Sequence, residues 1–287
     1  MIDSSTSITQ KEMASTMLDF VRQIPVSADL EWVKDFKFLY YFEAERLLVM
    51  RDALLNAGFS PESSFRVLDF GYLHGLIPEF LHRFFPKAQF TVFDHPESPN
   101  FQNQDYLQLI NTRSYLKLEP CDIAHLDKHE GKFDLIVLGE IIEHLDPTVV
   151  AKAVESLQKK ITGRGRLLIT TPNGAGIKNL FFTLIGRDTE HPVIPNATMN
   201  YGHIHLWPPQ QLEKTFQHYG WKNDKTYFTH GFERFAFCES NRHWGSLRHQ
   251  ILTKTLYFAA QKFPRWRGFT VSIWSSAKAR PDILPEP

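Results

Sequence analysis

The sequence is poor in cysteine and contains no long apolar run. Its 287 residues include two cysteines, Cys121 and Cys238. Two thiols cannot form a disulfide scaffold, and their spacing matches no zinc motif, so a reduced, cytoplasmic location is expected. The N-terminal stretch MIDSSTSITQKEMAS has no apolar core of a secretory signal. Because no run of about 18 apolar residues occurs, no transmembrane helix is expected either.

The chain also lacks an excess of charge of either sign. Lys+Arg and Asp+Glu number 32 each, whereas a protein that binds nucleic acid nonspecifically is normally basic. Nucleic acid is therefore disfavoured as a partner, and only a local basic patch would bind it. Apolar residues are abundant, since 43% of the chain is hydrophobic and 24 residues are Phe. This composition predicts a substantial folded core.

Hydrophobic periodicity predicts a helical layer followed by an α/β domain. Residues 8–58 have helical spacing, with a threonine cap at the start and Pro25 ending the first helix. Short strands then alternate with helices, which indicates a parallel sheet with helices on both faces. We expect an N-terminal helical cap over 1–60, a main domain over 61–280, and a lid-like insertion over 174–202. Strands are predicted at 65–70, 89–94, within 114–123, and at 133–140, 166–171, 221–230 and 268–279, and helices at 76–85, 148–161, 208–220 and 245–263.

Four predicted strands end in an acid: Asp69, Asp94, Asp122 and Glu140. In a sheet of this kind, ligands bind beyond the carboxyl ends of the strands. A strand end that is simply buried has no need of a carboxylate, because an unpaired buried charge is costly. The repeated acids therefore indicate a ligand site along that edge of the sheet.

The stretch VLDFGYLHG, residues 67–75, places two glycines after the first strand and just before a helix. Gly71 and Gly75 let the backbone approach a ligand, and the helix N-terminus offers free N–H groups. A nicotinamide dinucleotide would favour G-x-G-x-x-G, but the pattern here is D-x-G-x-x-x-G. Asp69 suits a cationic ligand better than a pyrophosphate. Asp94 can accept hydrogen bonds from two ribose hydroxyls, and Asp122 can accept one from the amino group of a base.

Taken together, the segments VLDFGYLHG, FTVFD, CDIAHL, FDLIVLGEIIEHLDP and GRGRLLITTPN resemble the successive motifs of class I S-adenosylmethionine-dependent methyltransferases over about residues 60–230. The resemblance implies a Rossmann-like, seven-stranded, mostly parallel sheet with the last strand inserted antiparallel. It implies S-adenosylmethionine as cofactor. Asp69, Gly71 and Gly75 would surround its methionine end, Asp94 would hold the ribose, Asp122 and Ile123 would border the adenine, and Gly139 and Glu140 would lie under the methyl-transfer site. The departure is Leu73, where the family usually has glycine. A degenerate domain without cofactor is the alternative that this departure suggests.

The segment GEIIEHLDP brings Glu140, Glu143 and His144 to one face if it turns helically after its strand. Two carboxylates and an imidazole can bind a divalent metal. The pattern resembles the ubiquinone-biosynthesis O-methyltransferases and the small-RNA 3′-end 2′-O-methyltransferases, whose E-x-x-E-H motif is followed by a later histidine. That resemblance implies a Mg²⁺ or Zn²⁺ site of Glu140, Glu143, His144 and His203, with His203 rather than His205 as the later ligand. In metal-free relatives this segment closes the pocket, so His144 as a catalytic base, or a purely structural pocket wall, are the alternatives.

We therefore expect a methyltransferase that methylates oxygen on a small molecule, with His144 and Glu140 as catalytic residues. The first alternative is a 2′-O-methyltransferase that acts on an RNA 3′ end, and the second is a non-catalytic binding module. The segment TPNGAG at 171–176 is either a substrate-site loop or simply a turn.

Overall fold

The computed structural model describes residues 8–25, 37–72, 75–177, 203–229, 255, 258–260 and 262–277. Leu73, most of the expected lid (178–202) and most of the late helix expected at 245–263 lie outside these residues. Within the part of the chain that is described, no helix has both the length and the apolar character needed to cross a membrane.

Seven strands form one sheet in the order β3-β2-β1-β4-β5-β7-β6. Neighbouring strands among β1 to β5 pair in parallel, and β7 runs antiparallel to both β5 and β6. The expected topology, with the last strand inserted antiparallel, is confirmed. The strands are β1 Arg66–Phe70, β2 Gln89–Asp94, β3 Leu116–Pro120, β4 Phe133–Gly139, β5 Ile161–Pro172, β6 Trp221–Thr229 and β7 Phe269–Ser276.

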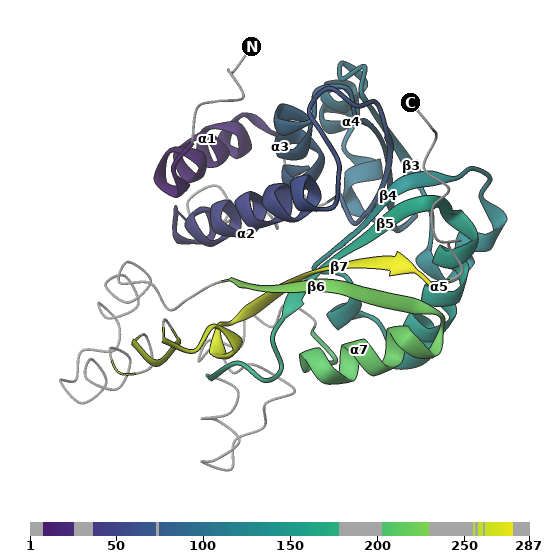
Figure 1. The fold of residues 1–287 in the computed structure, drawn as a ribbon. Helices are drawn as coiled ribbons and strands as arrows, with labels where there is room; N and C mark the ends of the chain where they lie inside the picture. Colours follow the sequence, from purple (N-terminus) through teal and green to yellow (C-terminus); the bar gives the residue numbers. More distant parts are fainter. Residues whose placement is uncertain are drawn as a thin grey trace, which may run out of the picture.

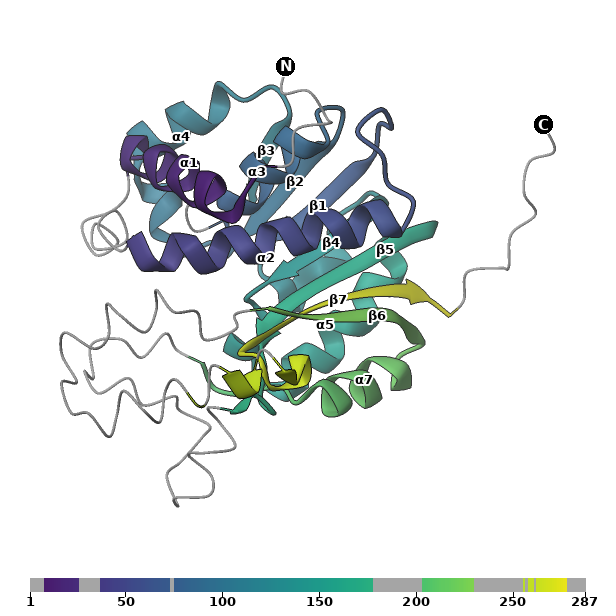
Figure 2. The ribbon, with the colours of Figure 1, turned by 60° about the vertical axis from the view of Figure 1, so that its left-hand side comes forward.

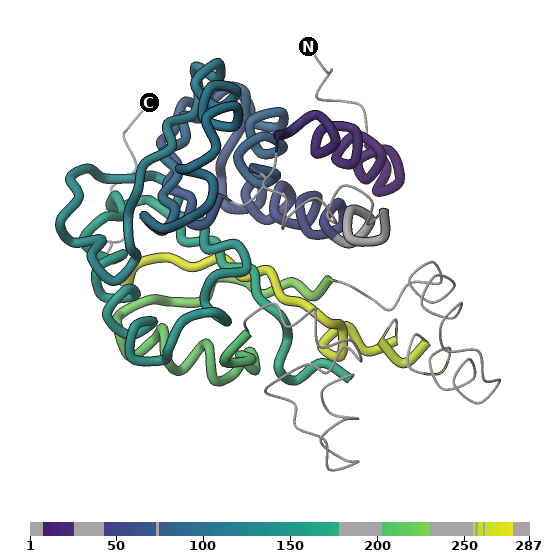
Figure 3. The backbone as a smooth tube through the Cα atoms, turned by 180° about the vertical axis from the view of Figure 1, so that it is seen from behind, coloured from purple at the N-terminus to yellow at the C-terminus, as the bar shows by residue number. Residues whose placement is uncertain are grey.

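Helices cover both faces of the sheet. On one face lie α1 Gln10–Gln23, α2 Lys37–Asn56, α3 Leu76–Phe84 and α4 Gln104–Asn111, and on the other lie α5 Pro147–Lys160 and α7 Pro209–His218 (Figures 1 and 2). The view from behind shows the N-terminal helices and α7 on opposite sides of the sheet (Figure 3). Side chains of β4 alternate between the two cores, since Leu135 and Val137 join the first and Ile136 and Leu138 the second.

The N-terminal helical layer packs on the same core as the sheet. Thr9 caps α1 as expected: its hydroxyl accepts from the Glu12 N–H at 3.3 Å, and the Glu12 carboxylate accepts from the Thr9 N–H at 2.8 Å. Buried Met17 of α1 and Leu47 of α2 belong to one cluster with Val67 of β1. Because these helices bury apolar surface against the sheet, they bring their own side chains close to the strand ends.

Two elements differ from the expectations. Helix α4 was not predicted, although Asn103 caps it by accepting from the Tyr106 N–H at 3.0 Å. Strand β5 is longer than the predicted 166–171, because α5 ends at Lys160 and the chain enters the sheet at once at Ile161. The pairing of β5 with β4 shifts register between Phe133 and Leu135, which accommodates the extra residues around Gly163 and Gly165.

Candidate active site

The four predicted strand-end acids lie along one edge of the sheet. Asp69 is in β1 and Asp94 ends β2, while Asp122 and Glu140 closely follow β3 and β4. These four strands are parallel neighbours in the sheet, so their carboxyl ends meet at the same edge. The sequence pattern and the topology thus agree on where the acids gather.

The glycine loop after β1 leaves no room for side chains at its two glycines. Gly71 has φ +77° and Gly75 has φ +70°, a region that residues with a Cβ rarely adopt. A Cβ at Gly71 would overlap the Ile141 side chain, and one at Gly75 would overlap the Tyr72 ring. Tyr72 is buried and packs edge-on against Tyr106 of α4, with ring centroids 5.6 Å apart. The backbone of the loop at these two glycines is therefore closely packed against the side chains of Ile141 and Tyr72.

Asp69 is completely buried, and no side chain among the described residues donates a hydrogen bond to its carboxylate. Burial raises the pKa of this carboxyl well above its ordinary value, although the Phe70 N–H and the charge of Arg46 act in the opposite direction. Buried polar groups are normally hydrogen-bonded. An acid without a side-chain partner, directly before a glycine loop, fits a ligand that carries positive charge or donates hydrogen bonds.

Asp94 and Asp122, by contrast, are held by their own neighbours in the sequence. The Asp94 carboxylate accepts from the His95 N–H at 2.9 Å, the Ser98 hydroxyl at 2.7 Å and the Asn100 amide at 3.1 Å. Asp122 accepts from the Ala124 N–H at 2.9 Å. Each carboxylate therefore has a fixed orientation before any ligand arrives.

Glu140 lies at the end of β4 in the left-handed region, with φ +57°. Its carboxylate accepts from the Thr170 hydroxyl at 2.8 Å and pairs with the Arg46 guanidinium at 2.9 Å. Arg46 comes from α2 and also contacts Glu43. Sequence reasoning missed Arg46. The only signal was an acid and a base three residues apart, within a helix whose neighbouring residues Leu47 and Met50 are buried.

Glu143 is fully buried and lies close to two histidines. Its Oε2 accepts from the Thr171 hydroxyl at 3.0 Å, and its carboxyl also contacts the carboxyl of Glu140. Burial raises the pKa of this carboxyl well above its ordinary value, and the nearby Glu140 charge adds to the effect. Glu143, His144 and His203 place one ligand atom each within 4.8 Å of one another. We call these three residues the Glu-His-His trio.

Three hydrogen bonds bring His203 to the turn that follows β4. The N–H groups of Ile204 and His205 donate to the Glu143 carbonyl at 2.8 and 3.2 Å, and the Trp207 indole donates to the Ile142 carbonyl at 3.2 Å. The rings of His144 and His203 are then 4.7 Å apart, whereas His205 packs against Trp207. Burial lowers the pKa of His203 to about 4, with the neighbouring His144 acting in the same direction. His203 is therefore neutral at physiological pH, as a metal ligand must be.

Hydrogen bonds of the TPNGAG segment, residues 171–176, hold the segment that carries His203 in place. The Asn173 amide donates to the carbonyls of Arg265 at 3.0 Å and Arg267 at 2.8 Å. The Gly174 N–H donates to the Trp207 carbonyl at 3.2 Å. Asn173 is completely buried. The TPNGAG segment thus joins the end of β5 to the segment that carries His203.

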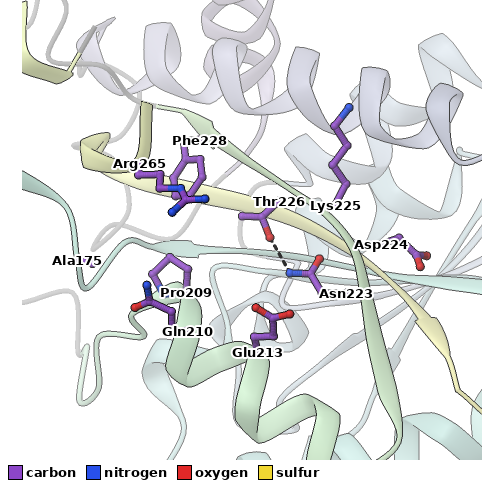
Figure 4. A pocket seen from close by; sticks show the side chains of 10 residues that line it. All are labelled: Ala175, Pro209, Gln210, Glu213, Asn223, Asp224, Lys225, Thr226, Phe228 and Arg265. Atoms are coloured by element: carbon purple, nitrogen blue, oxygen red, sulfur yellow. Dashed lines mark hydrogen bonds between the residues drawn. The ribbon is translucent and has the colours of Figure 1, made fainter. Parts of the chain in front are cut away.

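A separate pocket of about 380 Å³ lies between α7 and the edge strand β6 (Figure 4). Its wall includes Glu213, Asn223, Thr226 and Arg265, and the Asn223 amide donates to the Thr226 hydroxyl at 2.9 Å. None of the strand-end acids or members of the Glu-His-His trio lines it. This pocket is therefore distinct from the candidate active site.

The arrangement has relatives among known proteins. Residues 42–226 match the family model described as a methyltransferase domain, which is more than half of the 287 residues. No curated protein matches the chain in sequence.

Similar solved structures include the pyocyanin biosynthetic protein PhzM (12% identity, TM-score 0.53), where the match covers 90% of this chain and 61% of that one. The N-methyltransferase NodS from Bradyrhizobium japonicum WM9, in complex with S-adenosylhomocysteine, is 14% identical with a TM-score of 0.51, and the match covers 93% of this chain and 100% of that one. The mitomycin 7-O-methyltransferase MmcR is 11% identical with a TM-score of 0.50, over 94% of this chain and 69% of that one. Identities this low establish a common fold and nothing about the acceptor. The family match identifies the chain as a member of the methyltransferase domain family.

Proposed function

We propose that the chain transfers a methyl group from S-adenosylmethionine to a hydroxyl of a small molecule, assisted by a divalent cation. The observation that carries this proposal is the Glu-His-His trio at the same sheet edge as the strand-end acids. Two imidazoles and the buried Glu143 carboxyl converge there, and that carboxyl lies against a second acid, Glu140. A pocket wall without chemistry has no need of two adjacent acids, because burying neighbouring carboxylates costs stability.

The cofactor would lie across the ends of β1, β2 and β3. Gly71 and Gly75, whose left-handed φ values shape the loop after β1, would border its methionine end, and Asp69 would face the positively charged groups there. Asp94 is oriented to accept the two ribose hydroxyls. Asp122 and the buried Ile123 would border the adenine, and Gly139 would lie below the sulfonium. These assignments are the ones that the resemblance to class I methyltransferases implies.

The donor set of the Glu-His-His trio fits a cation such as Zn²⁺ or Mg²⁺. Imidazole favours zinc, and carboxylate suits either ion. Ligand atoms that share one ion at about 2.1 Å lie at most about 4.2 Å apart, so a separation within 4.8 Å requires only a small adjustment. A bound cation would lower the pKa of a hydroxyl that coordinates it. The expected fourth ligand, Glu140, is paired with Arg46 instead, so the trio alone forms the proposed site.

The chain itself would supply positioning and proton removal. While His144 holds the cation with Glu143 and His203, the cation-bound acceptor hydroxyl would lose its proton to solvent. Without a cation, His144, which lies beside His203, would instead be the base that takes this proton. General-base catalysis of this kind contributes about 10²–10⁴-fold. Glu140, next to Gly139 at the end of β4, would border the acceptor on the opposite side. The methyl group then passes in line from sulfur to oxygen, which depends mainly on how the two reactants are oriented.

A second candidate shares the same motif, namely methylation of the 2′-hydroxyl at an RNA 3′ end. The trio would serve a ribose hydroxyl as well as a phenol. Against it stands the balanced charge of 32 basic and 32 acidic residues, because RNA binding depends on neutralising phosphates. The small-molecule acceptor is therefore preferred, and the cytoplasmic location inferred from the sequence stays a prediction.

Radiolabelled methyl transfer tests the proposal. The full chain is incubated with labelled S-adenosylmethionine and, separately, with catechols, monophenols, alkyl amines and a small RNA with a free 3′ end. We expect label on a phenolic hydroxyl, and a large loss of transfer after chelation that added Mn²⁺ or Zn²⁺ restores. Label only on amines would contradict the acceptor, and label on RNA would favour the second candidate. Full activity after exhaustive chelation, also in Glu143→Ala and His203→Ala variants, would contradict the cation.

A further inference from the structure

Two acids only three residues apart are bound on opposite faces of the sheet. Glu140 accepts from the hydroxyl of Thr170, and Glu143 accepts from that of Thr171. Thr170 and Thr171 are consecutive in β5, so their side chains point to opposite faces. Glu140 is therefore held from the side of the N-terminal helices and Glu143 from the side of α5 and α7, and their two carboxyl groups meet at the strand end.

The backbone conformation of Glu140 accounts for this difference. Glu140 is the only non-glycine residue with positive φ in the described part of the chain. Regular alternation along β4 would place its side chain on the face opposite to Gly139, which is the face of Glu143. The left-handed conformation turns it away. Such a conformation is unfavourable for a residue with a Cβ and persists where surrounding contacts hold it.

Arg46 provides the strongest of those contacts. Its side chain is only 6% exposed, pairs with Glu140 at 2.9 Å and contacts Glu43. It also donates to the Thr170 hydroxyl at 3.2 Å. A guanidinium stays charged at all physiological pH values, and removing one partner from a buried ion pair leaves an uncompensated charge. Glu140 is therefore firmly held by its ion pair with Arg46.

We propose that Arg46 is a positioning residue that prevents the neighbouring Glu140 from becoming a fourth ligand of the cation site formed by Glu143, His144 and His203. The inference rests on the proposed function, since it concerns the composition of that site. A site with three protein ligands leaves coordination positions open for oxygens of the acceptor, as catalytic metal sites do. A fourth ligand from Glu140 would fill one of these positions. Helix α2 of the N-terminal layer thus sets the number of ligands at the sheet edge.

A double-mutant cycle on cation affinity tests this role. Mn²⁺, and separately Zn²⁺, is titrated by calorimetry into the full chain saturated with S-adenosylhomocysteine, for the wild type, Arg46→Met, Glu140→Gln and the double variant. We expect Glu140→Gln alone to change the affinity little. Arg46→Met should raise it by about tenfold, the scale on which neighbours of ligands tune metal sites. The double variant should lose this gain, because the freed carboxylate is then absent.

Two further variants serve as a control and as a substitute for Arg46→Met. Arg51→Met removes an arginine of the same helix whose partner is its neighbour Asp52, and should leave the affinity unchanged. If Arg46→Met does not fold, Thr170→Val removes a single bond to Glu140 and should give a smaller gain in the same direction. A tenfold loss of affinity in Glu140→Gln alone would overturn the inference, as would folded Arg46→Met with wild-type affinity. If no variant binds Mn²⁺ or Zn²⁺ while S-adenosylhomocysteine still binds, the cation site of the proposed function fails, and the role of Arg46 fails with it.

Discussion

The two halves of the sheet edge are built in different ways. At the ends of β2 and β3, the partners of Asp94 and Asp122 come from the next few residues, such as Ser98 and Ala124. At the ends of β4 and β5, Glu140 is bound by Arg46 and Thr170, and Glu143 by Thr171. After the proposed function, we call these the cofactor half and the transfer half. Local segments thus preorganise one half, whereas the other exists only when distant elements have packed. Substitutions should therefore separate cofactor binding from methyl transfer.

The largest effect is expected for Glu143→Ala. We expect turnover to fall by at least about 100-fold, the upper end of the 10–100-fold loss seen when only a neighbour of a metal ligand is changed, because a proposed ligand of the cation is gone. The dissociation constant for S-adenosylhomocysteine should stay close to that of the wild type, because Asp94 and Asp122 are untouched. Methyl transfer and calorimetry measure the two quantities, and Glu155→Ala, an exposed acid on α5, is the control. Equal losses in turnover and in affinity for S-adenosylhomocysteine would mean that the two halves are not separable.

Asp94→Ala should give the reverse pattern. The dissociation constant for S-adenosylhomocysteine should rise by about 10–100-fold, because hydrogen bonds to a charged group contribute about 1.5–3 kcal/mol. Turnover at saturating cofactor should change much less. Glu97→Ala, an exposed acid in the same loop, should bind as the wild type does. Unchanged affinity in Asp94→Ala would remove the ribose assignment.

Asp69→Asn should stabilise the protein in a manner that depends on pH. The folded state holds the Asp69 proton to higher pH than the unfolded state, because burial raises its pKa above the ordinary 3.8. Unfolding therefore releases this proton, and stability is lost as pH rises above 3.8 towards the raised value. An asparagine at position 69 has no proton to release, so the variant does not lose stability over this pH range. Each kcal/mol gained at pH 7 should raise Tm by about 2–4 °C, and the gain should vanish near pH 4. A gain that is constant with pH would contradict the assignment.

The sequence predicted the cofactor half better than the transfer half for a physical reason. Strand ends followed by acids are local patterns, so Asp69, Asp94 and Asp122 could be placed on one edge from strand order alone. The proximity of Glu143, His144 and His203 was inferred from a motif. The pairing of Arg46 with Glu140 had no local signal, since it joins residues on separate elements. The positive φ of Glu140 also has no signature in residue type, because the contacts that hold it are tertiary.

The smallest effect is expected for Trp207→Phe, which tests how the transfer half is assembled. The indole N–H holds the segment of His203 to the Ile142 carbonyl, and one such bond contributes about 0.5–1.5 kcal/mol. Mn²⁺ affinity should therefore fall by about 2–10-fold, while affinity for S-adenosylhomocysteine stays constant. Trp221→Phe is a matched control, because its buried indole donates to the Val154 carbonyl at the same 3.2 Å, away from the trio. It should cost similar stability without changing Mn²⁺ affinity. If both variants lower the affinity for Mn²⁺ equally, a general loss of stability of the fold, rather than the position of His203, determines cation binding.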